Sequence, residues 1–231
     1  MTTTTLSHQT NSTISLLSQW FAQGSKLFLK SPLKLFASLI AIIIVTGLLQ
    51  ILPAPIGIFV SKWIGAILGA ALWPLLNALD KEDHFSFKGL ANYTGWQYLP
   101  LLAFVLIVPF VFQIGVATIM LGEQGLALIL YGQIGDATAF EVGLLFASAA
   151  PLSILLMFVP ACLLLGGESV TKSVTKGVSM VLKTWQAMLA LTVLNALVLF
   201  LAPFTLVLSV VLMGPLLICV NYSAYQSLRH S

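Results

Sequence analysis

Charged residues are scarce in this sequence, and their scarcity limits what the chain can be. They make up 7% of its residues, against roughly 25% in a typical soluble domain. The net charge is only +3, which does not indicate a surface that binds nucleic acid. Hydrophobic residues instead account for 59% of the 231 positions. This composition is not that of a water-soluble domain, and we expect no nucleic-acid partner.

Cysteine and histidine are also rare, and the few that occur are not arranged for chemistry. Cys162 and Cys219 both lie in apolar runs, which indicates buried thiols and not a secreted disulfide framework. His8, His84 and His230 have no cysteine or carboxylate at metal-ligand spacing. Zinc motifs, nucleophile elbows, phosphate-binding loops and dinucleotide fingerprints are missing as well. We therefore expect no metal, no cofactor, no catalytic residue and no enzymatic activity.

Two long apolar runs occupy residues 35–79 and flank a proline-containing corner at 53–55. Each run is long enough to cross a bilayer, where a helix satisfies all of its backbone groups internally. Lys62 is the only charge between Lys34 and Asp80. This stretch predicts a transmembrane helical hairpin in an integral membrane protein.

The remaining apolar runs extend this pattern, so we predict an all-α polytopic protein with a single membrane domain, 1–231. Six transmembrane helices of about twenty residues each pair as hairpins. Spans three and four are interrupted by Pro109, Pro151 and Pro160. The expected segments are a disordered tail at 1–13, an interfacial helix at 14–31, a hairpin at 33–79, a second hairpin at 98–165, an interfacial helix at 169–184, and a third hairpin at 185–222.

The two segments before spans one and five are predicted to be amphipathic helices. In 14–31, one helical face carries the apolar side chains of Leu17, Trp20, Phe21, Gly24 and Phe28. In 169–184, valines occupy one face and lysines the other. Such helices suit the membrane surface. For the first of them, the alternative is a soluble cap that packs on the bundle.

Lysine and arginine are distributed unevenly over the predicted loops. All of them except Lys62 fall on one side of the predicted membrane, and the connection 122–142 contains none. By the positive-inside rule, both termini of this multi-pass protein are predicted to be cytoplasmic. The connection 122–142 is predicted to hold a short helix on the outer surface, with a re-entrant segment as the alternative.

A short sequence recurs before the first and the last hairpin. Residues 24–32 align without gaps to 177–185, with a glycine, a leucine and a lysine in common. A Pro-Leu-Leu sequence follows later in both copies, at 74–76 and 215–217. Both copies begin on the cytoplasmic side, which predicts a parallel internal repeat. Chance similarity between apolar sequences is the alternative.

These features together resemble a family of proteobacterial inner-membrane proteins. The resemblance is carried by the glycine-to-lysine segment before a proline-cornered hairpin, the Phe85-Ser-Phe87 loop, the basic amphipathic helix, and Tyr222 and Tyr225 near the end. The family is in turn similar to the membrane domain attached to some glycerophosphodiester phosphodiesterases. The resemblance implies a six-helix inner-membrane protein and brings no catalytic residues.

Small residues recur every four positions along the second span, at Gly57, Ser61, Gly65 and Gly69. Lipid tails give helices no hydrophobic reason to associate, so small residues supply contact through close backbone approach. This face either packs inside the bundle or docks a membrane protein partner or a second copy of the chain.

The lysines suggest contacts with lipid. Lys62, the one charge inside a predicted span, is either an anchor that extends to the outer surface or a functional charge. The lysines of the two amphipathic segments are candidates for contact with anionic lipid headgroups. These residues are Lys26, Lys30, Lys172, Lys176 and Lys183.

Two functions fit these patterns. The first is a non-enzymatic, structural or accessory component of a membrane assembly or envelope process, supported by the small-residue face and the basic helices. The alternative is a transporter or channel-like protein for a lipid or other apolar substrate, which needs no buried charges. A cleft inside the bundle would favour the alternative, whereas a solid bundle would not.

Overall fold

The computed structural model describes residues 2–83, 85 and 93–229, and every regular element in these ranges is helical. The elements are α1 (Thr2–Lys30), α2 (Pro32–Leu49), α3 (Ile56–Glu82), the 3-10 helix η2 (Thr94–Tyr98), α4 (Leu99–Leu106), α5 (Val108–Leu121), α6 (Glu123–Tyr131), α7 (Ala139–Ala147), α8 (Ala150–Leu156), α9 (Val159–Leu164), α10 (Val170–Lys183), α11 (Trp185–Phe200) and α12 (Leu208–Leu228). The predicted all-α class is therefore confirmed for this part of the chain.

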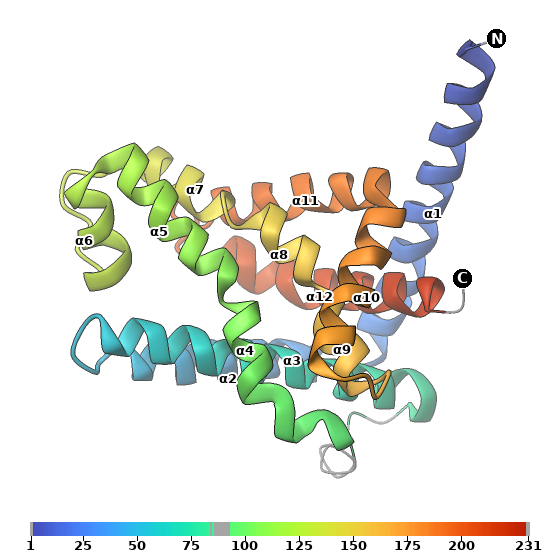
Figure 1. Cartoon of the computed structure of the whole chain (residues 1–231), viewed down its shortest axis with the longest axis horizontal. Coiled ribbons are helices and arrows are strands. Elements are labelled where there is room, and N and C mark those ends of the chain that lie inside the picture. Colours follow the sequence, from blue (N-terminus) through green and yellow to red (C-terminus); the bar gives the residue numbers. More distant parts are fainter. Residues whose placement is uncertain (1, 84, 86–92, 230–231) are drawn as a thin grey trace.

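The long helices form one bundle, and α1 stands across its end. In Figure 1, α2, α3, α11 and α12 run along the long axis of the molecule, while α4–α5 and α7–α8 run obliquely between them. The helix α1 packs mainly on α12 and also contacts α11, α2 and the last turn of α3. At the opposite end, α6 folds back against α5.

In the described part of the chain, five helical segments are long and apolar enough to cross a membrane: Pro32–Leu49, Ile56–Glu82, Gly95–Leu121, Ala139–Leu164 and Leu208–Leu228. The predicted fifth span, α11, has only 16 residues. It reaches the required length only together with α10, from which it is bent by 96°. Exposed apolar side chains lie along its length at Leu189, Val193 and Leu197, as expected for a surface that faces lipid.

Proline residues divide the two oblique spans into shorter helices. Pro109, Pro151 and Pro160 each lie in the first turn of a new helix, α5, α8 and α9 respectively. Proline has no backbone N–H and clashes with the preceding turn, so a helix restarts there more readily than it continues. Pro74 and Pro215, from the two Pro-Leu-Leu sequences, instead lie inside α3 and α12.

The apolar face of α1 packs on the protein itself. Trp20 is fully buried and its Nε1 donates a hydrogen bond to Ser227 Oγ at 2.7 Å. A Cβ atom added at Gly24 would lie 2.7 Å from the Cα of Val220, so α1 and α12 approach closely there. The face that suggested a membrane-surface helix is thus covered by α12. In addition, α1 begins at Thr2 and includes the residues expected in a separate tail.

The second amphipathic segment, α10, makes a comparable contact. A Cβ atom at Gly177 would lie 2.9 Å from the backbone N of Val159 in α9. Gly24 and Gly177 are the aligned glycines of the two sequence copies, and each meets the backbone of another helix. The internal repeat remains a prediction. The two copies share one structural feature, a glycine that allows close contact with the backbone of another helix.

The core fills one half of the bundle. Trp73 lies at its centre, with its ring centroid 5.7 Å from that of Tyr225, 6.3 Å from Tyr222 and 6.5 Å from Phe158. These aromatic side chains come from α3, α12 and the α8–α9 junction, and Tyr222 and Phe158 are almost fully buried. The core therefore ties together the helix ends that lie nearest α1.

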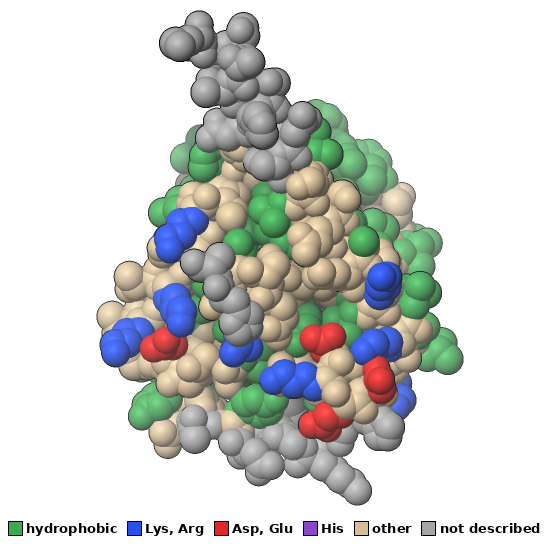
Figure 2. All heavy atoms as spheres, turned by 90° about the vertical axis from the view of Figure 1, so that its right-hand side faces the viewer, with side chains coloured by type: hydrophobic (Ala, Val, Ile, Leu, Met, Phe, Trp, Pro, Cys, Tyr) green, Lys and Arg blue, Asp and Glu red, His purple; other side chains and the backbone are tan. Residues whose placement is uncertain are grey.

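Charged side chains gather on the end of the bundle next to this core. Figure 2 shows Lys and Arg side chains, with a few acidic ones among them, spread over the face on which α1, α10 and the end of α12 lie. A charged end face adjoining apolar helix sides agrees with a protein whose helices enter a membrane from this end.

Candidate functional site: a cavity lined by Lys62

The half of the bundle opposite the charged face contains a cavity of about 520 Å³ that is open to the outside. Its wall comes from residues of all three predicted hairpins and from α6, and most of it is apolar. The lining residues are Gln50, Ile58, Lys62, Phe110, Gln113, Leu128, Ile129, Gly132, Phe146, Ala149, Ser153, Leu199, Ala202, Val207 and Val210. A volume of this size lies within the range of about 300–1,000 Å³ that is common for ligand sites.

Among the described residues of the lining, Lys62 is the only charged one. It lies in the second turn of α3, and its Nζ sits 5.4 Å from the centroid of the Phe110 ring, a cation–π contact. No carboxylate of the described residues forms an ion pair with it. A lone charge costs about 3 kcal/mol at the middle of a bilayer and less near the start of a span, where Lys62 lies. The Lys62 side chain is exposed, so water, lipid or a ligand can reach its ammonium group.

Two glutamines in the lining are held by hydrogen bonds to the protein frame. Gln113 Nε2 donates to the carbonyl oxygens of Leu145 and Phe146, at 3.1 and 3.3 Å, beside the break between α7 and α8. Gln50 Nε2 donates to Ser61 Oγ at 3.1 Å. These bonds fix both amides in place in the wall of the cavity.

The small-residue face of α3 contacts α2 at three of its four positions. Ser61 Oγ donates to the carbonyl oxygen of Thr46 at 2.8 Å, and a Cβ at Gly65 would lie 3.1 Å from the Thr46 methyl group. Gly57 meets the carbonyl oxygen of Leu52 in the same way. Only Gly69 has open space where a Cβ would be. Most of this face thus packs inside the first hairpin.

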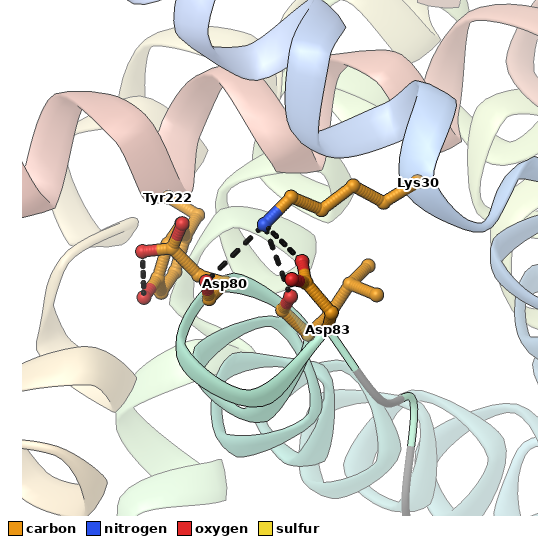
Figure 3. A network of polar contacts seen from close by, with 5 residues as sticks. Lys30, Asp80, Asp83 and Tyr222 are labelled. Atoms are coloured by element: carbon orange, nitrogen blue, oxygen red, sulfur yellow. Dashed lines mark hydrogen bonds and ion pairs between the residues drawn. The ribbon is translucent and has the colours of Figure 1, made fainter.

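The predicted lipid-contacting lysines all lie at the charged end, far from the cavity lining. Lys30 Nζ pairs with Asp83 Oδ1 at 2.6 Å and donates to the backbone carbonyl of Asp80 at 3.2 Å (Figure 3). It therefore caps the last turn of α3, where carbonyl groups have no partner within the helix. Lys26 is exposed beside it.

The lysines of α10 are exposed, as the amphipathic pattern predicts. Lys172, Lys176 and Lys183 lie on the outer side of the helix, while Val170, Val174 and Val178 pack against the bundle. Lys176 pairs with Glu168 at 2.9 Å. The hydrogen bond and the positive charge of Lys176 lower the pKa of the Glu168 carboxyl group. Lys172 and Lys183 form no ion pair with a described carboxylate.

Sequence reasoning did not find the cavity itself. Of its lining residues, only Lys62 stood out as a candidate functional group, and Gln50 and Gln113 carried no signal beyond being polar residues in apolar runs. Within residues 2–83, 85 and 93–229, no group of three or more His, Cys, Asp and Glu side chains is placed to hold a metal ion.

Comparison of the chain with protein-family models, with curated proteins and with solved structures gives no match. The class of the protein therefore follows from its own features. Several apolar helices of membrane-spanning length, with apolar side chains exposed along them, indicate a helical membrane protein.

Proposed function

We propose that this chain is a multi-pass protein of the bacterial inner membrane that binds an amphiphilic, lipid-like molecule without reacting with it. The observation that carries the proposal is the cavity lined by Lys62. It lies in a bundle of apolar helices, has a mostly apolar wall, and contains a single charged group. An amphiphile fits such a wall because its tail is buried against apolar side chains while its head meets the few polar ones.

The proposed orientation has six spans and both termini in the cytoplasm. Its support is the gathering of Lys and Arg side chains on one end of the bundle, which the positive-inside rule assigns to the cytoplasmic side. The cavity then opens toward the outer leaflet. In this arrangement α11 crosses the membrane and α10, at 96° to it, lies on the cytoplasmic surface. The resemblance to the membrane domains of glycerophosphodiester phosphodiesterases stays a hypothesis.

The role of an accessory subunit is less well supported by the geometry. Its support in the sequence was the small-residue face and the basic helices, and the face at Gly57, Ser61, Gly65 and Gly69 contacts the α2 side of the first hairpin at three positions. The exposed basic face of α10 remains available for a partner or for anionic lipid.

Native mass spectrometry after gentle extraction from the membrane tests the proposal. We expect the wild-type protein to retain bound lipid, and Ser153→Trp to lose it because the indole occupies the cavity. Ile119→Trp adds the same side chain at a position of α5 that is 87% exposed and outside the cavity, so it should bind lipid as the wild type does. Lipid retention that is equal in both variants, or absent from the wild type, would contradict the proposal. A stoichiometric second protein without lipid would favour the accessory role.

A further inference from the structure

We infer that the head of the bound amphiphile is an anion, phosphate or carboxylate, and that Lys62 holds it. This inference deepens the proposed function and rests on it. It concerns the class of ligand that the cavity selects.

The charge balance of the cavity favours an anionic head. Lys62 is the single charged residue in the described part of the lining, and no described carboxylate lies within ion-pair distance of its Nζ. Glu141, an acidic residue of the same end of the bundle, is already engaged, because its carboxylate accepts hydrogen bonds from Thr138 N and Oγ at 2.8 Å. An ammonium group inside a membrane span without a protein counter-ion favours a ligand that brings the negative charge with it.

The depth of Lys62 along α3 suits contact with a lipid headgroup. Six residues separate it from Ile56, the first residue of the helix, which corresponds to a depth of about 9 Å at 1.5 Å per residue. This depth is close to the level at which headgroups give way to acyl chains, if the helix begins at the membrane surface. The contact with the Phe110 ring keeps the Lys62 ammonium beside the wall that α5 contributes.

Lys62 has a few polar neighbours in a mostly apolar lining. Gln50 Nε2 donates one hydrogen bond to Ser61 Oγ at 3.1 Å, and its second N–H remains for a ligand. Gln113 Nε2 already donates to two backbone carbonyl oxygens, so its amide offers a ligand only an acceptor oxygen. The remaining wall is formed by aliphatic and aromatic side chains such as Leu128, Ile129 and Leu199. An anionic head therefore finds the Lys62 ammonium and one N–H of Gln50, and a hydrocarbon tail finds the apolar side chains of the wall.

Competition between lipids of matched acyl chains tests the inference. The delipidated protein is mixed with equal amounts of phosphatidylglycerol and phosphatidylcholine, and bound lipid is identified by native mass spectrometry. We expect phosphatidylglycerol to be preferred about tenfold, the order of magnitude that a charge-assisted contact supplies. Replacing phosphatidylglycerol by oleate in the same competition tells whether the phosphate or the carboxylate form of the anion is preferred.

Variants at Lys62 decide whether this residue causes the preference. Lys62→Met and Lys62→Gln should still bind lipid but lose the tenfold preference, whereas Lys62→Arg should keep it. Lys81→Met removes the same charge from the exposed last turn of α3, which is not proposed to contact lipid, and should leave the preference unchanged. An anion preference that survives in both neutral variants would overturn the inference while leaving the proposed function intact. A wild-type protein that binds neither lipid would overturn both.

Discussion

Tyr222 Oη lies 3.1 Å from Asp80 Oδ2, so a hydrogen bond joins α12 to the end of α3 across 142 positions of sequence (Figure 3). The same hydroxyl lies 3.2 Å from Asn77 Oδ1 and accepts a hydrogen bond from Gln226 Nε2. Lys30 of α1 reaches the same turn of α3 from the other side. The charged end of the bundle is thus held by a polar network as well as by its aromatic core.

Removing the hydroxyl of Tyr222 should destabilise the protein. Because Asn77 and Gln226 also lose a partner, we expect Tyr222→Phe to lower the free energy of unfolding by about 1–2 kcal/mol. Thermal unfolding in detergent, followed by tryptophan fluorescence, measures the change. Tyr98→Phe, at a residue that is 45% exposed, is the matched control and should have little effect. Equal unfolding temperatures for the two variants would show that the network adds no stability.

Alanine at the close helix contacts should be costly. A Cβ at Gly24 or Gly177 would lie within 2.9 Å of backbone atoms, which cannot move aside as a side chain can. We expect Gly24→Ala and Gly177→Ala each to cost about 1–3 kcal/mol, as for other overpacked sites. Gly69→Ala has open space and serves as the control. The same thermal unfolding assay would contradict this packing if Gly24→Ala matched Gly69→Ala.

The two cysteines should be inert in the folded protein. Cys162 and Cys219 are both 0% exposed, with Cys162 Sγ 4.0 Å from Met180 Sδ. We expect neither thiol to react with a maleimide in mild detergent, and both to react after denaturation. Intact-mass measurement before and after the reaction counts the labels. A labelled thiol in the folded protein would mean that the core next to α9 or α12 opens.

The proposed orientation can be tested with single added cysteines, since the native ones are buried. Ile134→Cys, in the connection between α6 and α7 at a site that is 62% exposed, should react in whole cells treated to admit reagents only to the periplasm. Ser179→Cys, on the exposed side of α10, should react only after the inner membrane is opened. A membrane-impermeant maleimide gives the readout. The reverse pattern of labelling would overturn the orientation.

Local features of the sequence predicted the elements well. The helices on either side of the corner at 53–55 follow from two apolar runs, and the breaks at Pro109, Pro151 and Pro160 follow from the missing backbone N–H of proline. The start of α11 at Trp185 matches the expected start of the fifth span. The positions of helices and of helix breaks depend on residues only a few positions apart. They can therefore be predicted from a single sequence.

Contacts between helices that lie far apart in the sequence could not be predicted from local patterns. The stripe containing Trp20 and Gly24 was correctly read as one apolar face, but the sequence could not tell whether lipid or protein covers it. In the structure α12 covers it. Lipid and a packed helix are both apolar surroundings, so the same stripe of residues satisfies either.

The sequence alone determined that this protein is helical, apolar and suited to a membrane, because hydropathy and proline positions act over one or two helical turns. Only the tertiary structure decided that residues from all three hairpins meet around a cavity at the end opposite the charged face, with Lys62 in its lining beside Phe110. That arrangement arises from how each helix is rotated and where it crosses its neighbours. Such choices are set by contacts between residues far apart in the chain.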